Sequence, residues 1–221
     1  MNILIAGANG KVGTILSGKL WAAHGISPIA LIRDSRQETK FTALGVPAVT
    51  GDLELGISSF LTGLDAVVFT AGSGSHTGPE KTTDVDQNAA IQLIKDCKRE
   101  GVQRFVMISA MGADPNSEST RIKHYLRAKG VADAFLRSSG LDYTILAPGT
   151  LLDERGNGRI EASEKLGFHG YLPREDLATC IIETIRNFFT IGKTIEVVAG
   201  SKKIKDALAQ VAGGGDIPPF V

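Results

Sequence analysis

The residues best suited to chemistry begin near the N-terminus, where three glycines follow a short apolar run. Gly7, Gly10 and Gly13 follow the apolar residues 3–5. An amphipathic segment begins near Lys11, between the second and third of these glycines. Gly7 can adopt a backbone conformation that side chains forbid, Gly10 lets the main chain approach a pyrophosphate, and Gly13 lets a helix pack closely on a strand. The N–H groups at the start of that helix would face the anion. The spacing predicts a strand, a phosphate loop and a helix, and hence a dinucleotide site; the alternative is an ordinary glycine-rich turn.

A charged pair ends the second apolar run and bears on the choice of coenzyme. Arg33 and Asp34 follow residues 27–32. In dinucleotide-binding sheets this position faces the adenosine ribose, where an acidic residue accepts from the 2′-hydroxyl and an arginine accommodates a 2′-phosphate. Arg33 comes first, Asp34 would point to the other side of the strand, and Arg36 adds a second positive group. We therefore expect NADP rather than NAD; the alternative is that these are ordinary charges at a solvated strand end.

Two further loops follow predicted strands at the same edge of the sheet. Asp52 can accept from the exocyclic amine of adenine and Leu53 can pack on its ring, although a Gly-Asp pair is also typical of a plain turn. Ala71, Gly72 and Ser73 are small enough for their loop to lie against the middle of the coenzyme, although such loops are often simply mobile. The phosphate loop supplies the remaining expected contacts of this half of the chain: Asn9, Lys11 and Val12.

A lysine lies within the apolar stripe of a helix expected over residues 120–139. Tyr125 and Lys129 are four positions apart and therefore share one face of that helix. An ammonium group is rarely buried without a partner, so we expect a polar crevice opposite Lys129. Ser109 ends the fifth expected strand, at the carboxyl edge where open parallel sheets bind ligands. The alternative is a tyrosine and a lysine on one exposed turn of a helix.

Strand-length and helix-length segments alternate along the chain. This alternation predicts an α/β fold in which helices flank one doubly wound parallel sheet, of the Rossmann type. We expect strands at residues 3–5, 27–34, 46–53, 64–70, 104–109, 141–149 and 194–199. We expect helices from residue 11, at 37–44, 84–99 and 120–139, from residue 172, and at 202–211, with a loop-rich stretch over 150–171. The prediction is a single NAD(P)-binding domain over residues 1–212, with small substrate-site elements near its C-terminus, and a flexible tail over 213–221.

The composition is that of a globular domain without a strong electrostatic field. The 221 residues include 24 basic and 24 acidic side chains, so no net charge attracts nucleic acid or an anionic membrane. Met1-Asn2 runs directly into the first strand and no apolar stretch is long enough to span a bilayer, so we expect no signal peptide and a cytoplasmic protein. Cys97 and Cys180 have no CxxC partner, which favours two buried thiols and no metal site.

Several stretches resemble the atypical short-chain dehydrogenase/reductase family, especially its small NAD(P)-binding, NAD-dependent epimerase/dehydratase-like and NmrA-like members. The GxxGxxG spacing of residues 7–13 is similar to the phosphate loop of that family, and residues 104–109, 141–149 and 174–178 resemble its fifth strand, sixth strand and late helix start. Tyr125-Leu126-Arg127-Ala128-Lys129 resembles the YxxxK of the catalytic members. The stretch after Pro148 is shorter than the substrate domain of extended members, which argues against nucleotide-sugar substrates.

The resemblance implies roles for three side chains and adds Pro148 to the expected cofactor contacts. Lys129 would hold the nicotinamide ribose and favour ionisation of Tyr125, which would transfer the substrate proton, while Ser109 would hydrogen-bond the reacting oxygen. The implied function is an NADP-dependent oxidoreductase acting on a small carbonyl or alcohol, as a monomer or homodimer. Two alternatives stay open: a sugar epimerase or dehydratase, and a non-catalytic sensor that binds NADP(H) and signals to a partner protein.

Overall fold

The apolar runs of the sequence form strands that are buried on both faces. Every residue of β4 and β5 is buried, as parallel strands covered by helices on both sides require. The computed structural model describes residues 1–74, 77–211 and 213, so most of the expected tail lies outside the described residues. Its strands are β1 (Asn2–Ala6), β2 (Ser27–Ile32), β3 (Ala48–Thr50), β4 (Ala66–Phe69), β5 (Arg104–Ile108), β6 (Asp142–Pro148), β7 (Thr150–Leu152), β8 (Arg159–Ser163), β9 (Tyr171–Pro173), β10 (Lys193–Ala199) and β11 (Lys202–Lys203).

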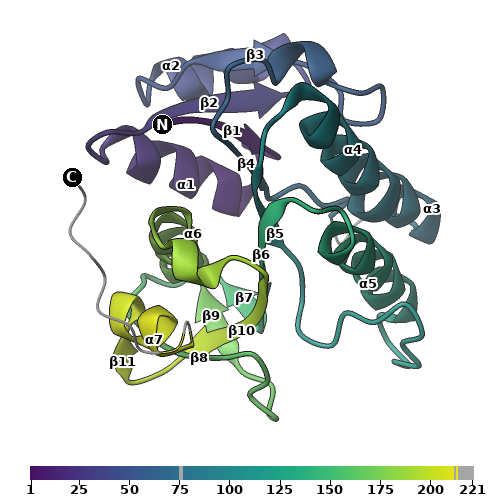
Figure 1. The fold of residues 1–221 in the computed structure, drawn as a ribbon, viewed down its shortest axis with the longest axis vertical. Coiled ribbons are helices and arrows are strands. Elements are labelled where there is room, and N and C mark those ends of the chain that lie inside the picture. Colours follow the sequence, from purple (N-terminus) through teal and green to yellow (C-terminus); the bar gives the residue numbers. More distant parts are fainter. Residues whose placement is uncertain (75–76, 212, 214–221) are drawn as a thin grey trace.

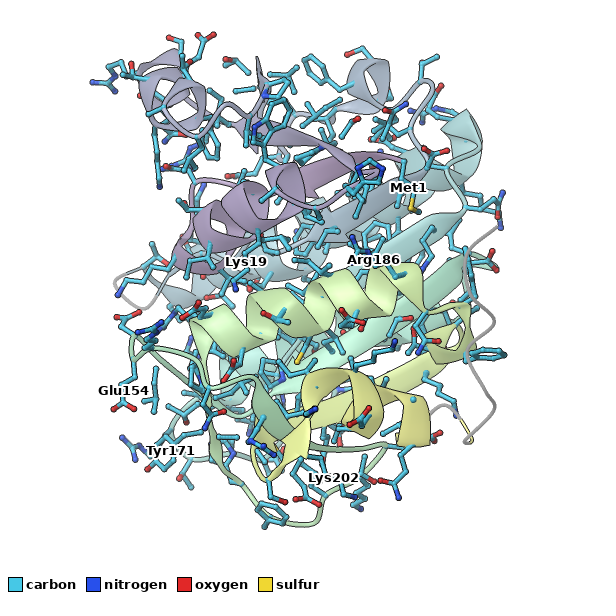
Figure 2. All side chains as sticks on the ribbon, turned by 90° about the vertical axis from the view of Figure 1, so that its left-hand side faces the viewer. Met1, Lys19, Glu154, Tyr171, Arg186 and Lys202 are labelled. Carbon is cyan, nitrogen blue, oxygen red and sulfur yellow. The ribbon has the colours of Figure 1, made fainter. Side chains whose placement is uncertain are left out.

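Helices cover both faces of the sheet (Figure 1). They are α1 (Lys11–Trp21), α2 (Glu38–Thr42), α3 (Pro79–Thr82), α4 (Ala90–Glu100), α5 (Lys123–Arg137), α6 (Arg174–Arg186) and α7 (Ile204–Val211). One apolar cluster joins the sheet to α1, α6 and α7, and a second joins it to α4 and α5. Figure 2 shows α1, which carries Lys19, beside α6, which ends at Arg186. The two-faced burial explains why the central strands carry no alternation of apolar and polar residues.

The strand order confirms the predicted fold class. The nine-stranded sheet runs β11-β8-β10-β6-β5-β4-β1-β2-β3. The pairs from β3 to β10 are parallel, and only β8 and β11 are antiparallel to their neighbours. The order β3-β2-β1-β4-β5-β6 within it is that of a doubly wound Rossmann sheet, which binds ligands outside the carboxyl ends of its strands.

The structure differs from the sequence-based expectation in two regions. The stretch 150–171, expected to be mainly loop, contains β7, β8 and the first residue of β9, and β7 and β9 form a separate two-stranded sheet. The helix expected from residue 84 begins at Pro79 and widens into a π-helical segment, η3 (Thr83–Ala89), before continuing as α4. Both cysteines are buried and unpaired, as expected. No helix among the described residues is long and apolar enough to cross a membrane.

Candidate functional site

The three glycines of the N-terminal loop differ in the space that a side chain would find at each position. Gly7 has φ +89°, and a Cβ added to it would lie 2.4 Å from the Ala71 nitrogen. A Cβ on Gly13 would lie 2.4 Å from the Gly7 oxygen. Both positions therefore exclude side chains for reasons of chain packing. A Cβ on Gly10 would meet only the Gly7 oxygen, at 3.3 Å, so at this position space stays available for a ligand.

A cavity of ≈ 340 Å³ lies at the carboxyl ends of four neighbouring parallel strands. Its wall comes from the loops after β1, β2, β3 and β4, which is where a doubly wound sheet binds a dinucleotide. Most of the expected cofactor contacts line it: Gly7, Asn9, Gly10, Arg33, Asp52, Leu53, Ala71, Gly72 and Ser73. One oxygen of Asp52 also accepts from the Glu54 main-chain N–H at 3.0 Å, so this residue both shapes the turn and faces the cavity.

The other expected cofactor contacts do not line this cavity. The Lys11 Nζ lies 2.5 Å from Asp153 Oδ2 on the surface, and the Val12 side chain packs in the core. Both residues lie in the first turn of α1, where main-chain N–H groups are available to an anion. Pro148 is buried, and its carbonyl accepts from the Met111 N–H at 3.1 Å. Lys129 lies behind the cavity wall, in a buried cluster of polar side chains.

The positive charge near the expected adenosine end is arranged differently from the prediction. Arg36 is bound by Asp34, so it does not supply a second free cation. The side-chain hydrogen bonds from Arg36 lower the pKa of Asp34 to about 2. Arg33 is exposed, lines the cavity, and has no ion pair or hydrogen bond within the described part of the chain. Lys40 was not predicted, yet its Nζ lies 3.1 Å from Asn9 Oδ1 beside the phosphate loop. Lys40 lies on the exposed side of the short helix α2, where lysines are common, so nothing in the sequence marks it as a binding residue.

Lys129 is buried, as its place in the apolar stripe implied, and it has a partner. It is 4 % exposed, and its Nζ lies 3.0 Å from Asp86 Oδ1 and donates to the Ile108 carbonyl at 3.1 Å. The same Nζ lies 5.9 Å from the centre of the half-buried Tyr125 ring. Burial lowers the pKa of Lys129, but the negative charges that Tyr125, Asp86 and Asp133 can carry outweigh it, so the net shift is upward. The expected polar crevice is therefore occupied by a carboxylate.

Ser109 is buried next to this cluster but faces a different group from the one expected. Its Oγ donates to Asp133 Oδ2 at 2.6 Å, and the described residues include no hydrogen bond between Ser109 and Tyr125. Lys129 binds the carbonyl of Ile108, the residue before Ser109, so the two pairs are adjacent. The structure thus joins Tyr125 to Lys129 and joins Ser109 to Asp133.

Two buried carboxylates in the cluster were missed by the sequence analysis. Asp86 is 1 % exposed and Asp133 is 2 % exposed. Asp133 lies four positions after Lys129, so the same face argument that singled out Lys129 could have found it. Asp86 lies in the π-helical segment, where the 3.6-residue period does not apply, and the sequence gives no comparable signal for it.

The buried carboxylate of Asp133 should make stability depend on pH. Burial raises the pKa of Asp133 to about 6, against a usual value of 3.8, although Ser109 and Lys129 oppose the rise. The stabilising effect of the raised pKa is present below pH 4 and is lost as the pH rises through 6, because the folded protein must then hold a buried anion. A rise of the pKa from 3.8 to about 6 corresponds to about 3 kcal/mol. We therefore expect Asp133→Asn to increase the free energy of unfolding by up to about this amount at pH 8 and hardly at pH 4.

Urea unfolding of both proteins at the two pH values measures this difference. The asparagine keeps an oxygen that can accept from Ser109, so the hydrogen bond is not removed with the charge. A variant that is less stable than the unmodified protein at pH 8 would contradict the prediction.

Comparison with known proteins points to one family. A model of the family described as NAD(P)H-binding matches residues 7–188. The "Uncharacterized sugar epimerase YhfK" of Bacillus subtilis (strain 168) is 34% identical over 215 residues, which are 96% of this chain and 100% of that protein. A solved structure of a provisionally named NAD-dependent epimerase/dehydratase from Bacillus halodurans is 38% identical, with a TM-score of 0.89, and the match covers 95% of this chain and 99% of the other. The oxidoreductase ylbE from Lactococcus lactis is 28% identical, with a TM-score of 0.82 and 96% of each chain covered.

Proposed function

The chain belongs to the NAD(P)H-binding family, of the atypical short-chain dehydrogenase/reductase type, and from this premise we propose that it is an NADP-dependent oxidoreductase of a small carbonyl or alcohol. The observation that carries the proposal is the buried ion pair of Lys129 and Asp86. It keeps an ammonium beside the Tyr125 ring and, through the contact of Asp86 with Ser73, next to the wall of the cavity. A charged lysine between a phenol and the wall of the cavity suits proton transfer at a bound coenzyme.

The residues around the cavity fit a nicotinamide dinucleotide. The space at Gly10 would take the pyrophosphate, Asp52 and Leu53 would face the adenine, and the loop of Ser73 would lie along the middle of the coenzyme. Arg33 would meet the 2′-phosphate. The coenzyme, when bound, supplies or accepts the hydride of the reaction.

The side chains of the buried cluster can move the proton that accompanies this chemistry. The Tyr125 phenol would give or take the proton of the substrate oxygen, and the Lys129 ammonium would stabilise its ionised form. Ser109 gives its single hydroxyl hydrogen to Asp133, so it can donate to a substrate oxygen only after it rotates or after Asp133 is protonated. In the second case the protonated Asp133 carboxyl would donate to the Ser109 oxygen, and the hydroxyl hydrogen of Ser109 could then be donated to the substrate oxygen.

A sugar epimerase is the second candidate, and the name of the Bacillus subtilis relative favours it. Against it, only the short strands β7, β8 and β9 separate β6 from α6, which leaves little chain for a sugar-binding domain. We also propose a cytoplasmic location, a monomer or homodimer, and no nucleic-acid or membrane partner.

The proposal is tested by two measurements on the purified protein. Fluorescence titration gives the affinities of NADPH and NADH, and a screen of quinones, aldehydes and small ketones follows the consumption of NADPH. Consumption with a small carbonyl supports the oxidoreductase. Interconversion of a sugar without net NADPH consumption would support the epimerase, and tight NADPH binding without any turnover would support the sensor.

Arg33 should set the coenzyme preference. We expect NADPH to bind more tightly than NADH, and Arg33→Ala to weaken NADPH binding by about 1.5–3 kcal/mol, because one charge-assisted contact to the 2′-phosphate is lost. NADH binding should hardly change. Arg36→Ala is the matched control, since Arg36 is also exposed but is bound by Asp34. Equal affinities of the unmodified protein for the two coenzymes would reject this role of Arg33.

A further inference from the structure

We propose that Asp86 is a positioning residue, which holds the Lys129 ammonium and the Ser73 loop in one fixed arrangement and thereby couples the side chains around Tyr125 to the wall of the coenzyme cavity. The proposal rests on the proposed function only in taking this cavity as the coenzyme site. No motif in the sequence marks Asp86, and its place follows from its contacts in the fold.

The two oxygens of the Asp86 carboxylate serve two different parts of the site. Oδ1 lies 3.0 Å from the Lys129 Nζ, and Oδ2 accepts from the Ser73 main-chain N–H at 2.9 Å. Oδ1 takes no hydrogen bond of regular geometry within the described residues, so the ion pair with Lys129 is its polar contact there. Both charged side chains are buried, and a buried charge is costly when its partner is removed. The Lys129 ammonium and the Ser73 main-chain N–H therefore depend on the same carboxylate.

The backbone around Asp86 is adapted to this position. Asp86 lies in the middle of the π-helical segment η3, and π-helical turns are rare and are found frequently at functional sites. The loop main chain passes directly against the carboxylate, because a Cβ added to Gly72 would lie 3.2 Å from Asp86 Oδ1. A second contact, between Ser73 Oγ and Thr82 Oγ1 at 3.1 Å, also joins the loop to this helical stretch.

Removal of the carboxylate charge should change the behaviour of Lys129 itself. Asp86 faces Lys129 from η3, Tyr125 and Asp133 face it from α5, and the Ile108 carbonyl faces it from β5. Without the closest of these negative groups, the burial of Lys129 is less well compensated, and its ammonium should release its proton at a lower pH. The loop at Ser73 should at the same time lose the acceptor that fixes its main chain.

The experiment compares Asp86→Asn with Asp96→Asn. Asp96 is a matched control because it is 2 % exposed and lies further along the same helical stretch, but it pairs with Arg99 at 2.8 Å and not with Lys129. Isotope-labelled lysine makes the side-chain nitrogen of Lys129 visible by NMR, so its protonation can be followed without any substrate. We expect Asp86→Asn to move this titration to lower pH and to raise the Kd for NADPH about tenfold or more. We expect Asp96→Asn to change neither, although it also lowers stability.

A second variant keeps the test decisive if Asp86→Asn does not fold. Asp86→Leu combined with Lys129→Met replaces the ion pair by apolar groups, which often preserves stability. This double variant should fold, and because it lacks the carboxylate that holds the Ser73 loop, its Kd for NADPH should rise about tenfold or more. An unchanged Kd for NADPH in the double variant would overturn the proposal.

The result that overturns the proposal is an Asp86→Asn protein with an unchanged Lys129 titration, or one with a shifted titration and an unchanged Kd for NADPH. If no form of the protein binds NADPH, the proposed function fails, and the Lys129 titration alone then decides whether Asp86 positions the ammonium.

Discussion

Replacement of Tyr125 by phenylalanine is expected to reduce turnover about 10²- to 10⁴-fold while NADPH binding stays close to that of the unmodified protein. The phenylalanine keeps the half-buried ring that lies 5.9 Å from the Lys129 Nζ and removes only the hydroxyl. That hydroxyl makes no hydrogen bond within the described residues, so its loss leaves no protein group unpaired and should not affect stability. The loss corresponds to roughly 3–5 kcal/mol in the reaction barrier.

Two further variants show whether the effect belongs to proton transfer. Tyr143→Phe is the control, because its hydroxyl donates to the Gly192 carbonyl at 2.9 Å and, unlike Tyr125, its ring has no contact with the Lys129 ammonium within the described residues. Lys129→Met should lower both turnover and NADPH affinity, since it removes the charge beside the phenol and leaves Asp86, which also binds the Ser73 loop of the cavity wall, without its buried partner. If Tyr125→Phe turned over a substrate at the original rate, the Tyr125 hydroxyl would have no part in proton transfer and the proposed role of this residue would be rejected.

Gly10→Val is expected to abolish coenzyme binding without unfolding the protein. Gly10 has φ −67° and ψ 165°, an extended conformation that valine adopts easily. The new Cβ would meet only the Gly7 oxygen, at 3.3 Å, so the backbone needs little adjustment. The side chain would instead occupy the space that the pyrophosphate requires. Thermal unfolding should give nearly the same Tm as the unmodified protein, and NADPH should produce no fluorescence change.

Gly13→Val is the contrasting variant at the same loop. Its Cβ would lie 2.4 Å from the Gly7 oxygen and 2.7 Å from the Ala8 Cα, which are both backbone atoms. The loop would have to move, so coenzyme binding and Tm should fall together. If Gly10→Val bound NADPH as tightly as the unmodified protein, the coenzyme would lie elsewhere and the assignment of the cavity would be wrong.

The sequence predicts the central part of the fold well because burial on both faces leaves a strong pattern there. The runs that become β4, β5 and β6 are nearly continuous in apolar residues, as parallel strands require. The strands β7, β8 and β9 are short and half-buried and have no such pattern. The pairing of β8 with β10 and of β7 with β9 is decided by the packing of distant segments, which a local period does not encode.

The residues of the candidate site also differ in how well the local sequence predicts their positions. The phosphate loop is local, and its glycines are required by contacts among neighbouring residues, so their spacing predicts the cavity. The partner of Lys129 is not local. Asp86 reaches it from another helix, and the π-helical segment displaces Asp86 from the regular period that places side chains on a helix face. The contact of Lys40 with Asn9 is likewise a product of tertiary packing.

The packing of α1 against α6 also has a consequence for synthesis on the ribosome. The last residue that lines the cavity is Val85, whereas Leu16 of α1 shares its apolar cluster with Ile181 and Leu208, which are synthesised much later. Until then the apolar face of α1 lacks this cover, and such surfaces on incomplete chains favour aggregation and chaperone binding. The helix that follows the glycine loop therefore lacks part of its hydrophobic cover until α6 and α7 have been synthesised.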